Sequence, residues 1–162
     1  MGFTEAEAVK LFSKHNGICV LASGNAWQTV RKFGGDNNYV MFNRGTVWTQ
    51  KRIKFEAVHA EHSDDRAIGV IISYGGSNYY ITGDTLYNKK VINDINLPID
   101  AVFLPINGAG NNMNMTDAAR LAEIIKAKVA VPVHFGMFDN LNPEDFNFKN
   151  KVIPQIYKEI KL

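Results

Sequence analysis

Three potential metal ligands, His62, Asp84 and His134, each lie just past a segment with the pattern of a β-strand. Strand ends are where sheet-based folds place functional side chains, because the sheet fixes the backbone while the loop exposes the side chain. Two neutral imidazoles and one carboxylate suit Zn, Fe or Mn, and a carboxylate can also bridge two ions. The three residues are far apart in the sequence, so only the fold can bring them together.

Each of these residues also has a plainer interpretation. A single histidine at a strand end is more often a surface or hydrogen-bonded residue than a metal ligand. The Gly-Asp-Thr segment at 83–85 is, by itself, an ordinary turn signal. The metal hypothesis therefore depends on the three residues being considered as a set.

The middle of the chain is rich in short β-type segments separated by turn residues. The expected strands are 39–42, 46–49, 53–59, 67–74 and 78–82. In the third of these, Ile53, Phe55, Ala57 and His59 alternate with charged residues, which is typical of a strand with one solvated face. This part of the sequence predicts a meander of mostly antiparallel strands.

Helices and strands alternate on both sides of this meander. Before it, the sequence predicts helices at 4–14 and 25–33 around a strand at 18–21. After Asp84 it predicts, in order, a helix near 86–93, a strand at 101–106, a helix around 118–125 and a strand at 129–133. Two further helices are predicted near the end. One begins at Asn142-Pro143, and the other would bury one face, an inner stripe made of Ile153, Ile156, Tyr157 and Ile160. We expect an α/β fold with a mixed sheet, at least one face of which is covered by helices, and a single domain over 1–162.

Composition narrows the classes of function. The 162 residues are 46% hydrophobic, enough to fill one core, and 18 basic residues against 16 acidic ones give a net charge of only +2. We therefore expect no nucleic-acid partner, and no apolar run is long enough for a membrane span. The single cysteine, Cys19, fits a reducing cytoplasmic setting and is interpreted as a small core residue.

Several segments, taken in order, resemble the metallo-β-lactamase fold. They are Val58-His59-Ala60-Glu61-His62-Ser63, Tyr80-Ile81-Thr82-Gly83-Asp84-Thr85, Leu104-Pro105-Ile106-Asn107-Gly108 and Val131-Pro132-Val133-His134-Phe135-Gly136. They are most similar to the branch of metal-dependent hydrolases that contains L-ascorbate-6-phosphate lactonase. The resemblance implies an αββα sandwich, of which this chain would supply the C-terminal part.

The resemblance also implies a set of roles. His62 and His134 match histidines that hold different ions of a two-metal centre, and Asp84 matches the carboxylate that bridges them and serves catalysis. Zn or Mn would polarise a carbonyl or phosphoryl oxygen of a small ester, lactone or phosphorylated sugar and would hold a hydroxide nucleophile. Arg66 and Asn107 are candidates for binding that small-molecule substrate, although Arg66 is favoured to pair with Asp64 or Asp65.

The sequence departs from the family pattern at its start. The family has an His-x-His-x-Asp-His loop immediately before a helix like 4–14, and this chain lacks that motif. His15 has no neighbouring ligands that would let it substitute. We therefore expect an N-terminally incomplete domain that binds metal weakly and hydrolyses poorly by itself. The alternative is a non-catalytic binding or structural module, or one half of a homo-oligomer or of an assembly that another chain completes.

Two further features have open interpretations. His59 is interpreted either as a hydrogen-bond donor behind the metal ligands or as a histidine at the edge of the core. The polar loop containing Asn107, Gly108, Asn111 and Asn112 is expected near the site, although asparagine and glycine are also plain turn formers.

Overall fold

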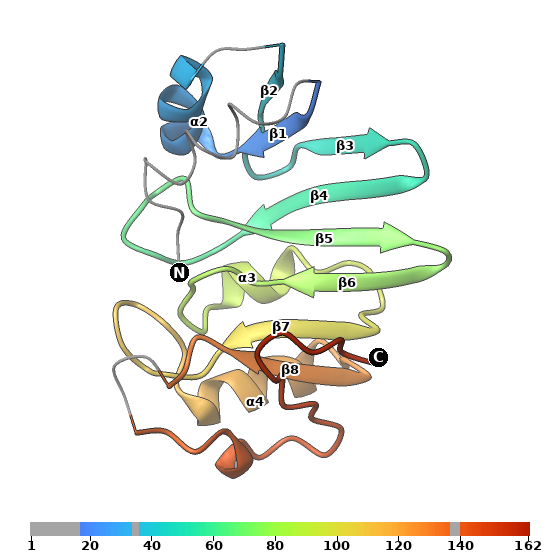
Figure 1. Cartoon of the computed structure of the whole chain (residues 1–162). Coiled ribbons are helices and arrows are strands. Elements are labelled where there is room, and N and C mark those ends of the chain that lie inside the picture. The colour runs from blue at the N-terminus through green and yellow to red at the C-terminus, as the bar shows by residue number, and fades with distance from the viewer. Residues whose placement is uncertain (1–16, 34–35, 137–139) are drawn as a thin grey trace.

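The computed structural model describes residues 17–33, 36–136 and 140–162, and Figure 1 shows their arrangement. The predicted helix at 4–14 and His15 lie outside these residues. The strands are β1 (Cys19–Ala22), β2 (Asn38–Met41), β3 (Val47–Gln50), β4 (Ile53–His59), β5 (Ile68–Tyr74), β6 (Ser77–Ile81), β7 (Ala101–Pro105) and β8 (Val129–Val133). The helices are α2 (Gly24–Val30), α3 (Lys89–Asn93) and α4 (Met115–Ile124), with 3-10 turns at Arg31–Phe33 and Pro143–Asp145.

A six-stranded sheet runs through the molecule in the order β3-β4-β5-β6-β7-β8. Its first four strands are antiparallel neighbours, whereas β6, β7 and β8 are parallel to one another. The change occurs where short hairpin turns give way to the connections through α3 and α4, because parallel neighbours need a crossover. The predicted mixed sheet and the antiparallel meander over β3–β6 are confirmed.

The hydrophobic core lies between this sheet and helices α3 and α4. Val58, Tyr80 and Val102 from the sheet pack in one cluster with Val91 of α3 and Leu121 of α4, and all five are at most 2% exposed. Asn88 and Asn114 cap the two helices by accepting hydrogen bonds from Lys90 N and Asp117 N. The predicted covering of one sheet face by helices is therefore confirmed. None of the helices that the structure describes has the length and apolar character needed to span a membrane.

Strands β1 and β2 form a separate two-stranded parallel sheet, with α2 as the crossover between them. The prediction that the strand at 39–42 belongs to the antiparallel meander is wrong in this respect. Since α2 returns the chain to the starting end of β1, the next strand pairs parallel to β1. In Figure 1 this small unit lies beyond the β3 end of the larger sheet.

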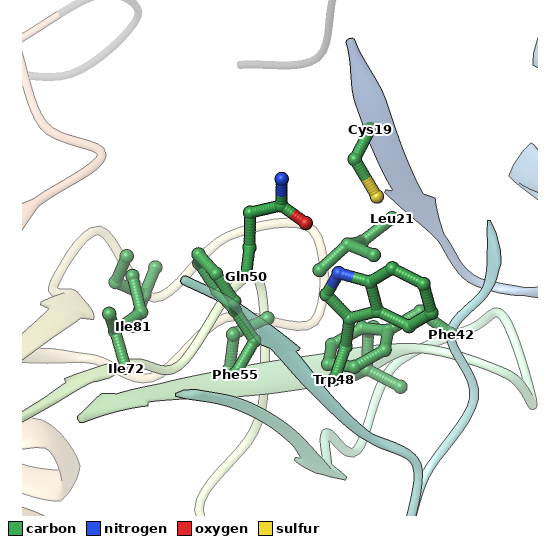
Figure 2. A pocket seen from close by; sticks show the side chains of 10 residues that line it. Cys19, Leu21, Phe42, Trp48, Gln50, Phe55, Ile72 and Ile81 are labelled. Atoms are coloured by element: carbon green, nitrogen blue, oxygen red, sulfur yellow. The ribbon is translucent and has the colours of Figure 1, made fainter. Parts of the chain in front are cut away.

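An apolar pocket of about 390 Å³ lies between β1 and the second face of the larger sheet. Figure 2 shows Cys19 and Leu21 of β1 on one side and Trp48 and Phe55 of the larger sheet on the other. Side chains alternate along a strand, so Phe55 points away from the core that holds Val58. Cys19 is thus a half-buried lining residue rather than a core residue as predicted, and burial raises the pKa of its thiol.

The predicted terminal helix is absent from the described residues, where 153–160 contains only a short turn. Ile156 is 85% exposed and Tyr157 is fully exposed with φ of +59°, so neither forms an inner stripe. Pro154 explains the difference, because a proline lacks the N–H donor and disfavours helical backbone at Ile153. The helix predicted after Asn142 is likewise only the 3-10 turn Pro143–Asp145.

Candidate functional site

The three predicted ligands lie at one edge of the six-stranded sheet. Strands β6, β7 and β8 are parallel, and β4 runs in the same direction because it is separated from β6 by one antiparallel strand. The carboxyl ends of all four strands therefore point the same way, as Figure 1 shows. His62 follows β4, Asp84 follows β6 and His134 follows β8. The topology thus brings residues distant in sequence to a common edge.

His62 is held by contacts to both of its ring nitrogens. Nε2 lies 3.0 Å from the carbonyl oxygen of Gly110, which belongs to the loop after β7. Nδ1 lies 3.1 Å from Oγ of the neighbouring Ser63. A carbonyl oxygen can only accept a hydrogen bond, so Nε2 is the donor in the first contact. The half-buried imidazole is thereby oriented by the loop of a different strand.

Asp84 follows a tight turn at Gly83. Gly83 has φ of +65°, and a Cβ atom there would lie 3.0 Å from the carbonyl oxygen of Ile68. Glycine is suited to this backbone conformation because it has no Cβ to clash. The turn leaves Asp84 exposed at the edge of the sheet, and no described residue hydrogen-bonds to its carboxylate. The carboxylate is therefore available to a ligand.

His134 also has unusual backbone geometry, with φ of +58°. A non-glycine residue with positive φ is uncommon, and such conformations gather at functional sites. Its Nδ1 lies 3.4 Å from Nδ2 of Asn112, a side chain only 5% exposed. The imidazole is thus placed by a buried amide from the loop after β7.

The loop at 107–114 contributes two buried polar atoms that have no partner among the described residues. These atoms are Oδ1 of Asn107 and Oδ1 of Asn112. Asn107 and Asn114 also form an isolated antiparallel bridge that closes the loop. Buried amide oxygens normally accept a hydrogen bond, so these two can receive a donor from a ligand or from water. The loop therefore contacts both candidate histidines, His62 through Gly110 and His134 through Asn112.

A polar network supports the loop that carries His62, and the sequence did not identify most of its members. His59 Nε2 lies 3.1 Å from Oε2 of Glu61, and Asn88 Nδ2 donates to the same oxygen at 3.0 Å. The backbone N–H of His59 donates to Asp94, which also accepts two hydrogen bonds from Arg44. His59 thus contacts Glu61 and Asp94, and none of the three candidate ligands is among its hydrogen-bond partners in the described residues. The sequence gives no indication of the parts of Glu61 and Asn88 in this network beyond their residue types.

The expected ion pair of Arg66 with Asp64 or Asp65 is not found among the described residues. The Asp64 carboxylate instead accepts hydrogen bonds from Asn25 Nδ2 and from the backbone N–H of Arg66, both at 2.9 Å. The Arg66 side chain lies against Gly24, where a Cβ atom would come within 2.9 Å of Arg66 Cδ. The prediction was wrong because α2 supplies both a partner for Asp64 and a surface for Arg66.

The donor types at this edge suit Zn or Mn, but the described residues do not complete a metal site. In residues 17–33, 36–136 and 140–162, no group of three His, Cys, Asp or Glu side chains is close enough to hold an ion. The two nitrogens of His62 are engaged by Gly110 and Ser63 as described above. Tight binding of zinc normally requires three or four protein ligands. The arrangement therefore supplies separate donors rather than a finished metal centre.

Comparison with known proteins identifies the family. The sequence profile of the family described as Beta-lactamase superfamily domain matches residues 12–135, which is more than half of the chain. This chain therefore belongs to the β-lactamase superfamily, as the resemblance of its motifs implied.

Relatives and solved structures agree with this assignment. The chain is 27% identical over 173 residues to a UPF0173 metal-dependent hydrolase from Thermoplasma volcanium, covering 97% of this chain and 75% of the relative. It is 33% identical over 85 residues to one from Carboxydothermus hydrogenoformans, covering 51% of this chain but only 37% of the relative. Its fold is similar to that of the metallo-beta-lactamase fold protein YhfI from Bacillus subtilis, with a TM-score of 0.73, 19% identity and coverage of 91% of this chain and 68% of that one.

Proposed function

We propose that this chain belongs to a metal-dependent hydrolase whose substrate is a small ester, lactone or phosphorylated sugar, with His62, Asp84 and His134 as its metal donors. The observation that carries the proposal is the placement of all three at one edge of the sheet, with the loop after β7 in contact with both histidines. Topology could have placed these residues at opposite edges, in which case no common site would be available. The metal in this proposal is Zn or Mn, since imidazole and carboxylate donors suit both.

Two residues at the same edge are proposed to bind the substrate. Arg66 is exposed in the connection between β4 and β5 and has no carboxylate partner among the described residues, so its guanidinium can bind an anionic group. Asn107 presents a buried amide oxygen with no described partner, which can accept a hydrogen bond from a substrate hydroxyl. Together they suit a substrate that carries both an acidic group and a hydroxyl.

We further propose that a protein made of these 162 residues alone has a low hydrolytic rate. His62 and His134 are assigned to different ions by the resemblance, so each ion would have only one histidine and a share of Asp84. A site with so few protein ligands holds its metal loosely. Donors from another chain would complete such a site.

The proposal is tested by assaying the purified chain on small lactones and phosphorylated sugars with added Zn²⁺ or Mn²⁺. We expect slow hydrolysis that requires the added metal and falls at least tenfold in Asp84→Asn and in His134→Gln. Asp65→Asn, an exposed carboxylate on the β4–β5 connection, is the matched control and should leave the rate unchanged. Hydrolysis that needs no metal and persists in Asp84→Asn would overturn the proposal.

A second candidate role is assembly through the apolar pocket in Figure 2. Its ten lining residues include no charged side chain, and Trp48 Nε1 is buried without a described partner. Ile81 on this face is 42% exposed. A face of this kind is best covered by another apolar surface, and a second copy of the chain presents one. We therefore propose that two copies associate through this face.

Light scattering after size-exclusion chromatography tests this second role. We expect a dimer whose fraction rises with protein concentration. The substitution Ile81→Lys should dissociate this dimer into monomers. Tyr74→Lys places the same charge at an exposed aromatic residue outside the pocket and should leave the dimer intact. A monomer at all concentrations would reject this role.

A further inference from the structure

Thr85, the residue after Asp84, lies between the loops that carry two of the candidate ligands. Its side chain is fully buried, at 0% exposed. Its hydroxyl oxygen accepts a hydrogen bond from the backbone N–H of Glu61 at 2.8 Å and donates one to the carbonyl oxygen of Leu86 at 3.0 Å. The hydroxyl thus uses its donor and an acceptor position at once, which a hydrocarbon side chain cannot do.

The backbone around Thr85 also contacts the loop after β7. Leu86 N donates to the carbonyl oxygen of Glu61 at 2.8 Å, so the loops after β4 and β6 are joined twice. Met113 N donates to the carbonyl oxygen of Thr85 at 2.9 Å. Glu61 precedes His62, and Met113 follows Asn112, which contacts His134. Thr85 is therefore in direct contact with the loop that carries His62 and with the loop after β7, which in turn contacts His134 through Asn112.

We propose that Thr85 is a positioning residue, whose hydroxyl fixes the backbone of Glu61 and thereby the place of His62 relative to Asp84. The inference rests on the proposed function for the roles of His62 and Asp84, and on the contacts above for the link between them. A threonine in a turn often hydrogen-bonds only to nearby backbone. Here the contact to Glu61 spans 24 residues of sequence, so it determines tertiary placement as well as the local turn.

The nature of the side chain makes the proposal specific. Valine has nearly the same shape as threonine but no hydroxyl, so Thr85→Val keeps the packing and leaves the Glu61 N–H without its acceptor. Thr85→Ser keeps the hydroxyl and loses only the methyl group. The two variants therefore separate hydrogen bonding from packing at a single position.

The test uses NMR of the chain without metal, so its result does not depend on the proposed activity. In Thr85→Val we expect amide hydrogen exchange at Glu61 to become at least tenfold faster and the imidazole signals of His62 to shift, while Thr85→Ser resembles the wild type. Thr85→Ala supplies the same comparison if the valine variant does not fold. Unchanged Glu61 exchange and unchanged His62 signals in the variants without a hydroxyl would overturn the proposal.

A stability control separates positioning from general destabilisation. Ile99→Ala removes buried volume just before the start of β7, at the opposite edge of the sheet from the strand-end loops, and should lower the melting temperature without moving the His62 signals. If Ile99→Ala shifts those signals as Thr85→Val does, Thr85 acts only through global stability and the positioning role is rejected. A parallel Zn²⁺ titration tests the proposed function separately. We expect at least threefold weaker binding in Thr85→Val than in Thr85→Ser, whereas no binding by the wild type would reject the metal site and leave the NMR result standing.

Discussion

His62 Nε2 lies 3.0 Å from the carbonyl oxygen of Gly110, and this contact joins the loop after β4 to the loop after β7. Since the carbonyl oxygen only accepts, the proton of this hydrogen bond belongs to Nε2. A metal ligand must use an unprotonated nitrogen, so binding of an ion at Nε2 would replace both the proton and the contact to Gly110. If His62 binds a metal through Nε2, as proposed, that binding would be coupled to the position of the 107–114 loop.

The first prediction concerns metal retention. After dialysis of the isolated chain against a chelator and then against metal-free buffer, we expect much less than one equivalent of Zn or Mn per chain by elemental analysis. The reason is the small number of donors that the described residues bring together. A stoichiometric, chelator-resistant ion that His62→Gln and His134→Gln both release would contradict this prediction.

The second prediction concerns stability in acid. The Arg44 guanidinium donates two hydrogen bonds to Asp94 and holds the pKa of that carboxyl below its ordinary value. A carboxyl whose pKa is lowered by folding contributes stability above its unfolded pKa of about 3.9 and loses that contribution as pH falls through the lower folded pKa.

We therefore expect Asp94→Asn to reduce stability at neutral pH and to flatten the loss of stability below about pH 4. Arg44 is half exposed, so Arg44→Met should cost only about 0.5–1 kcal/mol at neutral pH. Urea denaturation at several pH values measures both effects. Equal slopes of stability against pH in the wild type and Asp94→Asn would show that Asp94 does not contribute in this way.

The third prediction concerns a tyrosine in the core. Tyr80 is fully buried, and its hydroxyl has no hydrogen-bond partner among the described residues. Burial raises the pKa of this phenol far above its ordinary value, with a smaller contribution from the charge of Asp94. A buried polar group without a partner costs about 1–3 kcal/mol, so we expect Tyr80→Phe to raise the free energy of unfolding by roughly 1 kcal/mol.

Thermal or urea denaturation checks this result, with Tyr79→Phe on the opposite face of β6 as the control. Tyr79 is only partly buried, so its substitution should change stability by less than about 0.5 kcal/mol. A clear loss of stability in Tyr80→Phe would mean that the hydroxyl has a partner in solution.

The fourth prediction concerns the C-terminal segment. Because Ile156 and Tyr157 are exposed rather than packed in a helix, Ile156→Ser and Tyr157→Ser should each change the free energy of unfolding by less than about 0.5 kcal/mol. Phe146, which is fully buried, is the contrasting position, and Phe146→Ala should cost about 3–5 kcal/mol. A loss above 2 kcal/mol in either exposed variant would indicate that this segment packs in solution as the helical pattern suggested.

The sequence by itself determined the kinds of element and the candidate ligands. Alternation with period two identified β4, and apolar runs identified β5, β7 and β8 to within one residue at each end, because these patterns follow from burial of one or both strand faces. His62, Asp84 and His134 were recognised from residue type, strand-end position and motif resemblance. The terminal helix is the main error, because Pro154 interrupts the helical spacing of Ile153 and Ile156.

Only the tertiary structure decided which strands are neighbours and which groups support the site. Pairing of β1 with β2 in a separate sheet depends on where α2 returns the chain, which no local pattern encodes. The roles of Thr85 and Asn112 depend on hydrogen bonds between loops more than 20 residues apart in sequence. Such contacts form because the strands of one sheet bring their carboxyl ends to a single edge. The spacing of residues in the sequence carries no information about the distance in space between the loops at that edge.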